Sequence, residues 1–241
     1  IGALTTWANV FASGNRSFGI KTDGTLWSWG QNFIGYYEFN FGVAGLGVGD
    51  STSRNSPVQV GTATDWSNAV IAGDAWGAMK GIKSDGSLWA WGGNYLGNTM
   101  IEPSPTNNLS FNLVSADNWT SARAVKAVQV YNSRGGGVLA RRSDGTLWRW
   151  GGSGTAFGAG EYTDDPVHWR SSPVQVTTGS KWTDEYDVGS QNRSIAIDSD
   201  GKLWKLTSAA SLLATGSWSK VAMGFDAGAP ASIYNLCLTT T

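Results

Sequence analysis

The sequence predicts an all-β fold built from repeats, and three observations support this prediction. One short motif recurs along the chain, the 241 residues include 33 Gly and 14 Trp, and only 15% of the residues are charged. A motif that returns at a nearly fixed interval indicates a repeat architecture. Many glycine-rich turns between short aromatic segments are typical of strands. The repeats are marked by four Asp-Gly pairs, which lie 62, 59 and 56 residues apart: Asp23-Gly24, Asp85-Gly86, Asp144-Gly145 and Asp200-Gly201.

Each repeat is expected to contain a β-hairpin centred on its Asp-Gly pair. In the first copy, residues 20–30 read IKTDGTLWSWG, and residues 82–92, 142–151 and 197–206 are variations of it. Asp-Gly between two apolar runs predicts a two-residue type I′ turn, because Gly adopts positive φ freely and Asp tolerates it. The residue between the two tryptophans varies from copy to copy, so we expect it to meet water or a loop.

The tryptophans of the motif are predicted to form the core of the repeats. The two tryptophans of Leu-Trp-x-Trp share one face of a strand, and a single hairpin is too small to bury them. We therefore expect neighbouring copies to stack on one another. The predicted core comprises the four Asp-Gly turns with these tryptophans: Trp27, Trp29, Trp89, Trp91, Trp148, Trp150 and Trp204, the fourth copy having Leu206 in the last position.

Taken in order, the chain divides into four repeats and an incomplete fifth: 1–61, 62–117, 118–177, 178–217 and 218–241. Residues 1–7 align with 60–66, and residues 233–240 read as a strand that leads toward an Asp-Gly turn. Both ends therefore fall inside a repeat. We expect the chain to be a window on a longer polypeptide, or one member of an assembly in which other repeats or subunits complete the fold.

Two further segments of the first repeat carry a resemblance to a known family. Gly45-Leu46-Gly47-Val48-Gly49-Asp50 follows the tryptophan hairpin, and Arg54-Asn55-Ser56-Pro57-Val58-Gln59-Val60 follows that segment. Together with Asp-Gly-x-Leu-Trp-x-Trp-Gly-x-Asn, they resemble the repeat of the regulator of chromosome condensation family. The resemblance covers nearly the whole chain. It implies a β-propeller of four-stranded antiparallel blades, usually seven, of which this chain has about four.

Composition excludes several classes of function. The formal net charge is −1, so no electrostatic footprint for nucleic acid is present, and no apolar run is long enough to span a membrane as a helix. The only histidine, His168, has no nucleophile motif nearby, and the only cysteine, Cys237, lies in a strand-like run where we expect it to be buried. We expect neither an enzyme nor a bound cofactor or metal.

Two insertions are the candidate binding segments, because insertions in repeat proteins form loops that are often at the binding face. The first contains Tyr36, Tyr37, Phe39 and Phe41, aromatic side chains that make good interface anchors. The alternative is that they pack over an edge of the propeller. The second, residues 156–170, includes Tyr162, His168 and Trp169.

Two acidic groups are candidate calcium ligands, since Ca²⁺ takes six to eight oxygen ligands. One is Glu161, Asp164 and Asp165, and the other is Asp184, Glu185 and Asp187. Their spacing matches no calcium loop, so we expect solvated side chains instead.

The amino-acid sequence of the repeats favours a non-enzymatic propeller that is a structural or adhesion module of a virion or cell surface. The near-verbatim copies look most like the repeats of bacterial extracellular and bacteriophage virion proteins. Scarce charge and single Cys and His residues suit a protein that persists outside a cell. The partner would be a protein or a surface glycan. The alternative is a regulatory protein-binding propeller, similar to a guanine-nucleotide exchange factor or an enzyme inhibitor.

Overall fold

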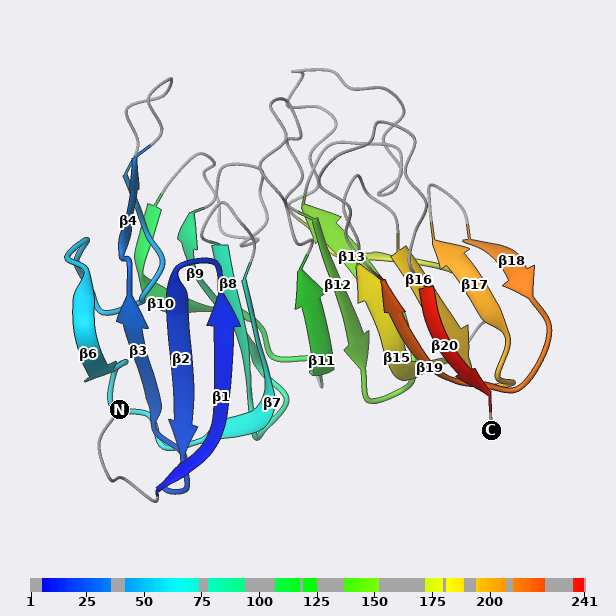
Figure 1. Ribbon diagram of the computed structural model, residues 1–241, viewed down its shortest axis with the longest axis horizontal. Helices are drawn as coiled ribbons and strands as arrows, with labels where there is room; N and C mark the ends of the chain where they lie inside the picture. The colour runs from blue at the N-terminus through cyan, green and yellow to red at the C-terminus, as the bar shows by residue number, and fades with distance from the viewer. Residues whose placement is uncertain are drawn as a thin grey trace.

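The structure, a computed structural model, describes residues 6–35, 42–73, 78–93, 107–117, 119–124, 137–151, 172–179, 181–188, 194–206, 210–223 and 236–240. All the regular elements in these ranges are strands, and they confirm the predicted all-β fold of four-stranded antiparallel blades (Figure 1). No helix that is long and apolar enough to cross a bilayer occurs in the described part of the chain.

Blades 1 and 2 are antiparallel sheets whose strands follow each other along the chain. Blade 1 has the order β1-β2-β3-β6 and blade 2 the order β10-β9-β8-β7. A small two-stranded sheet, β4 (Phe33–Gly35) with β5 (Gly42–Ala44), is inserted between β3 and β6. The remaining bounds are β1 (Trp7–Ser13), β2 (Arg16–Lys21), β3 (Leu26–Gly30), β6 (Arg54–Gln59), β7 (Trp66–Gly73), β8 (Ala78–Lys83), β9 (Leu88–Gly93) and β10 (Asn107–Ser115).

Blades 3 and 4 repeat this plan, and a two-stranded sheet follows them. Blade 3 has the order β11-β12-β13-β14, blade 4 the order β15-β16-β17-β18, and β19 pairs with β20. Their bounds are β11 (Trp119–Ala124), β12 (Gly137–Arg142), β13 (Leu147–Gly151), β14 (Val174–Gln175), β15 (Trp182–Val188), β16 (Ser194–Asp198), β17 (Leu203–Leu206), β18 (Ala210–Ala214), β19 (Trp218–Met223) and β20 (Leu236–Thr240).

The first strands of successive sheets contact one another and form the inner side of the array. β1 contacts β7, β7 contacts β11, β11 contacts β15, and β15 contacts β19. Hydrophobic side chains fill the space between the sheets in separate clusters, each drawing on adjacent blades. One of them joins Phe18 and Leu26 of blade 1 to Trp66 and Trp91 of blade 2. The stacking of neighbouring copies is therefore what buries the apolar faces.

The turn type predicted for the Asp-Gly pairs is wrong. The Gly24 amide donates to the Lys21 carbonyl (2.9 Å), and the Lys21 amide donates to the Thr25 carbonyl (3.0 Å). This pattern is a three-residue loop, a type I turn followed by a left-handed glycine with φ of 78°. The closing pair of the hairpin is therefore Lys21 with Thr25 rather than Thr22 with Thr25, and Asp23, inside the loop, accepts hydrogen bonds from Thr25.

At the position between the two tryptophans, the expectation of water or a loop holds in only some of the blades. Ser28, Ala90 and Arg149 are buried, and only Lys205 is exposed. Ser28 contacts a loop, one of the two expected surroundings: its hydroxyl donates to the Leu46 carbonyl at 2.8 Å. The residue therefore closes the sheet against the segment that follows it.

Candidate functional site

The two ends of each blade differ in construction, and we name them the turn face and the loop face. The turn face carries the four Asp-Gly turns and the links between blades. The loop face is the opposite end, where the first and third strands of each blade finish, at Ser13 and Gly30 in blade 1 (Figure 1). The two faces therefore differ in the groups that they offer to a partner.

The turn face is held together by one device that recurs in three blades. Oδ1 of Asp23 accepts hydrogen bonds from the amide (3.0 Å) and hydroxyl (2.6 Å) of Thr25, and Oγ1 of Thr25 accepts from the indole of Trp27 (2.8 Å). The same relay runs from Asp85 through Ser87 to Trp89, and from Asp144 through Thr146 to Trp148. These contacts explain why the motif has Asp, a hydroxyl residue and Trp at alternate positions.

A cation completes the relay in these three blades by lying over the tryptophan. Nζ of Lys21 is 3.6 Å from the ring centre of Trp27, Nζ of Lys83 is 4.5 Å from that of Trp89, and Cζ of Arg142 is 4.1 Å from that of Trp148. Each cation also faces the first tryptophan of its own blade, at 5.5, 5.5 and 4.7 Å: Trp7, Trp66 and Trp119. Cation–π contacts of this kind stabilise by roughly 0.5–1 kcal/mol when exposed.

The glycine of each turn ties its blade to the next one. The carbonyls of Gly24, Gly86, Gly145 and Gly201 accept hydrogen bonds from the amides of the next blades' first tryptophans, at 3.2, 2.9, 2.8 and 3.0 Å: Trp66, Trp119, Trp182 and Trp218. The hydrogen bonds of the turn face therefore join each blade to the next.

The relay predicts a pH dependence of stability. Hydrogen bonds from the Thr25, Ser87 and Thr146 hydroxyls hold the pKa of Asp23, Asp85 and Asp144 below the usual value of 3.8. A carboxyl whose pKa is lower in the folded state stabilises the fold above the unfolded pKa and loses that contribution as the pH falls through the folded one. We expect the urea midpoint to hold from pH 7 to about 5 and to decrease below that. Replacing all three aspartates with Asn should reduce the decrease of the urea midpoint at acid pH. An unchanged slope of the urea midpoint against pH would contradict this prediction.

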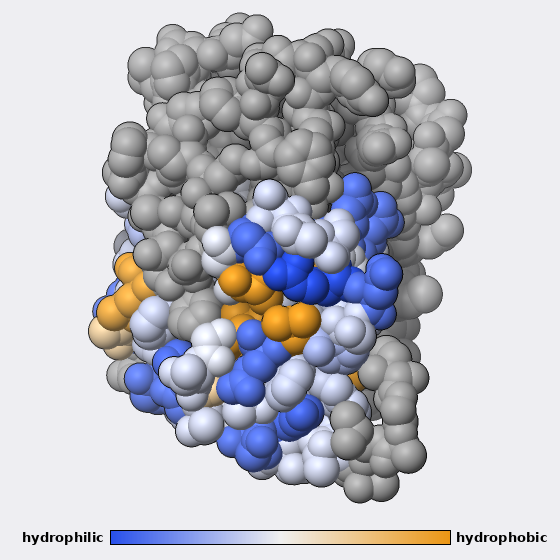
Figure 2. All heavy atoms as spheres, turned by 90° about the vertical axis from the view of Figure 1, so that its left-hand side faces the viewer, coloured by the Kyte–Doolittle hydropathy of each residue, from blue (hydrophilic) through white to orange (hydrophobic). Residues whose placement is uncertain are grey.

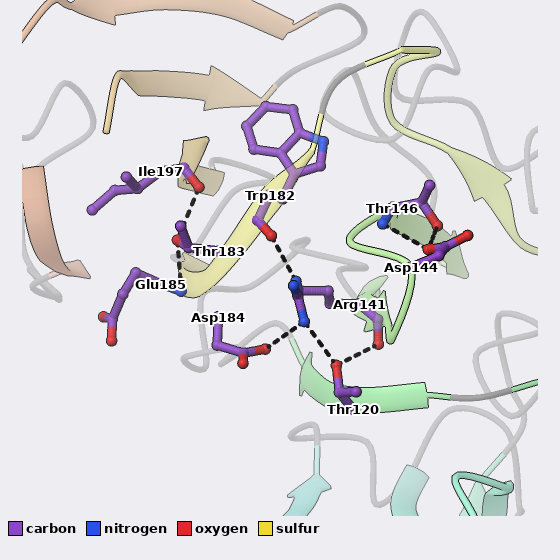
Figure 3. A network of polar contacts seen from close by, with 9 residues as sticks. All are labelled: Thr120, Arg141, Asp144, Thr146, Trp182, Thr183, Asp184, Glu185 and Ile197. Carbon is purple, nitrogen blue, oxygen red and sulfur yellow. Dashed lines mark hydrogen bonds and ion pairs between the residues drawn. The ribbon is translucent and has the colours of Figure 1, made fainter. Parts of the chain in front are cut away.

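Two of the candidate calcium ligands on β15, Asp184 and Glu185, form ion pairs. Arg141 donates to the Trp182 carbonyl (2.7 Å) and to Thr120 (3.2 Å) and lies 3.4 Å from Asp184, as Figure 3 shows. Glu185 pairs instead with Lys220 of the next sheet. Within the described ranges, no group of three or more His, Cys, Asp or Glu side chains is placed to hold a metal ion. Residues 161–165 lie outside these ranges.

On the loop face, the structure describes the base of the first aromatic insertion. β4 and β5 pair through Phe33 with Ala44, Ile34 with Val43 and Gly35 with Gly42. β5 also contacts β9 and β10, so this hairpin lies against blade 2. The predicted anchors Tyr36, Tyr37, Phe39 and Phe41 fall in its connecting segment and lie outside the described residues, as do Tyr162, His168 and Trp169.

A polar network fixes the chain that returns from this hairpin to blade 1. The fully buried Asn32 accepts a hydrogen bond from the Leu46 amide (2.9 Å) and donates to the Asp50 carbonyl (2.6 Å). Asp50 in turn pairs with Arg54 at 2.6 Å, and this contact holds the pKa of the carboxyl below its usual value. The sequence signal for this network is the recurrence of Asn after Trp-Gly-x together with Gly-x-Gly-Asp and a following Arg, the segments that carry the family resemblance.

Exposed apolar surface is sparse in the described part of the chain. Figure 2 shows a face on which hydrophobic side chains form a small area among hydrophilic ones. Large exposed hydrophobic side chains within the described ranges are Val10, Leu113, Leu212 and Leu213. These are scattered over three blades, so they do not define an interface by themselves.

The sheets and their stacking define the class of this molecule, a β-propeller of repeated four-stranded blades. The structure is similar to human WBSCR16 (TM-score 0.65, 14% identity, 92% of this chain and 56% of that one) and to yeast RCC1 (Prp20) bound to Kap60 (0.65, 14%, 88% and 51%). It is also similar to Prp20p from Saccharomyces cerevisiae, a structure reported with its binding properties to Gsp1p and histones (0.66, 13%, 89% and 53%). The chain spans about half the length of these proteins. No family model and no curated protein matches the sequence.

Proposed function

We propose that the chain is a non-enzymatic, protein-binding propeller of the regulatory kind, and that it contacts its partner through the loop face. The observation that carries the proposal is the β4–β5 hairpin, which lies against blade 2 while the Asn32–Asp50–Arg54 network holds its return. The described base of the insertion is therefore held in place, and a binding segment on a fixed base loses less entropy on binding than one on a mobile base. Similar propellers are described in complex with Kap60 and as binding Gsp1p and histones, which supports a protein partner.

Site-specific photo-crosslinking tests which face binds. A benzoylphenylalanine at Tyr37 should capture one defined protein from the native source, and the same probe at Thr22, in a turn of the opposite face, should not. Equal capture at both positions, or capture at Thr22 alone, would contradict the proposal. Nothing in this test depends on naming the partner in advance.

A second function, a structural or adhesion module on a virion or cell surface that binds protein or glycan, is favoured by one observation. The turn-face relay is almost verbatim in three blades, and the chain has few charged residues, a single Cys and a single His. Fractionation of the native source separates the two proposals. Co-sedimentation with virions or envelope supports the surface module, whereas a soluble complex with one protein supports the regulatory propeller.

A further inference from the structure

Blade 4 departs from the other blades at the position that holds the cation over the tryptophan. Asp198 stands where blades 1 to 3 have Lys21, Lys83 and Arg142, and Lys202 stands where they have a hydroxyl residue. The strand pairing shows the equivalence, because Trp182 is opposite Asp198 just as Trp7 is opposite Lys21. The charge at this position is therefore reversed in one blade.

The aromatic frame is unchanged by the reversal. Trp182 and Trp204 have ring centres 6.1 Å apart at 76°, and Trp7 and Trp27 are 6.2 Å apart at 82°. In blade 4 the short carboxylate side chain of Asp198 replaces the long side chain of lysine and lies at the nitrogen edge of the Trp204 ring. Within the described part of the chain, no basic group lies over either ring of blade 4.

The Asp198 carboxylate is nearly buried and forms no ion pair with the described residues. The residue is 8% exposed, Oδ1 accepts from the amides of Asp200 (3.0 Å) and Lys202 (2.9 Å), and Oδ2 accepts from the Trp204 indole (2.8 Å). The Lys202 ammonium group pairs with Asp200 at 2.9 Å and also feels the charge of Asp198, but it forms no ion pair with Asp198. A shielded carboxylate held only by neutral donors has an electrostatic preference for a nearby cation.

We propose that Asp198 and the partly exposed Trp204 form a binding site for a cationic nitrogen, supplied by a lysine or methylated lysine of a partner protein, with the buried Trp182 supporting the Trp204 ring from behind. An aromatic ring and an adjacent carboxylate are groups that recognise ammonium ions. In blades 1 to 3 the chain fills the corresponding position with its own cation, so the site is unique to blade 4 among the described blades. It lies on the turn face and is separate from the β4–β5 hairpin. This inference rests on the proposed function only in assuming that the lysine belongs to a partner protein.

A titration with tetramethylammonium chloride, followed through the indole ¹⁵N–¹H resonances, tests the site without any partner. The Trp204 resonance, assigned with Trp204→Phe, should shift and saturate with a Kd on the order of tens of millimolar, while Trp27 should not shift. Sodium chloride and tert-butanol are the controls for ionic strength and for an uncharged group of similar shape. A shift that Trp27 shares, or none at 100 mM, would overturn the proposal.

The double variant Asp198→Lys with Lys202→Thr supplies the matched control. It gives blade 4 the residues of the other blades, Lys-Ser-Asp-Gly-Thr-Leu-Trp, and should therefore fold with its own relay and cation. We expect it to weaken tetramethylammonium binding at least tenfold, with unchanged chemical shifts in blades 1 and 2. Retained binding in the folded double variant would show that the reversed charge does not create the site. Failure of the titration leaves the loop-face crosslinking result unaffected, so the two proposals can fail separately.

Discussion

Replacing Gly24 with Ala is expected to destabilise the chain by roughly 3 kcal/mol or more, because it damages two structures at once. Gly24 has φ of 78°, which costs a residue with a Cβ about 1–2 kcal/mol. A Cβ built there would lie 2.0 Å from the carbonyl oxygen of Thr64, a backbone atom of the link to blade 2. Relief of that clash would displace the link and the hydrogen bond from Trp66 to the Gly24 carbonyl.

Gly49 is the matched control for this substitution. Its φ of 86° is nearly the same, but a Cβ built on it has nothing within 4 Å. Gly49→Ala should therefore show the conformational cost alone, about 1–2 kcal/mol. Urea unfolding compares the two variants, and hydrogen exchange at the Trp66 amide should accelerate only in Gly24→Ala. Equal losses of stability would mean that the link between blades 1 and 2 adds nothing to the conformational cost of the substitution.

The sequence was sufficient for the features that local chemistry and periodicity determine. Asp-Gly flanked by apolar runs specifies a hairpin, and a tryptophan pair too large for one hairpin requires stacked copies, as the packing of Trp91 against Phe18 shows. The turn type was missed because a two-residue and a three-residue loop share the same dipeptide. The three-residue loop is the one found, and in it Asp23 accepts hydrogen bonds from the amide and hydroxyl of Thr25.

The parts of the site that the sequence did not reveal depend on contacts between distant residues. Asn32 and Asp50 are 18 positions apart, and neither has a local pattern that indicates the other. The exchange of charge in blade 4 is readable only when Asp198 and Lys202 are considered together, because each replaces a different member of the relay. Conversely, the aromatic anchors of residues 36–41 and the segment 156–170 remain predictions.

Replacing Trp91 with Ala is expected to cost roughly 3–5 kcal/mol, the range for an aromatic side chain removed from a core. Trp91 belongs to blade 2 and is fully buried, yet it contacts Phe18 of blade 1 and donates its indole hydrogen to the Gly45 carbonyl at 3.0 Å. Its loss therefore opens a cavity between two blades. In repeat proteins the interaction energies between neighbouring repeats govern the cooperativity of unfolding. We therefore expect the unfolding transition to broaden or split as blade 1 separates from the others.

Two further variants separate the contributions of Trp91. Trp91→Phe keeps much of the apolar contact but leaves the Gly45 carbonyl without its donor, which should cost about 1–3 kcal/mol. Trp29→Ala removes the tryptophan at the same repeat position of blade 1, where it is only partly buried and lies against Trp7 of its own blade. It should cost about half as much and leave a single transition. If Trp29→Ala and Trp91→Ala gave the same loss and the same cooperativity, the coupling between blades 1 and 2 would have to come from the Gly24–Trp66 link rather than from the stacked indole.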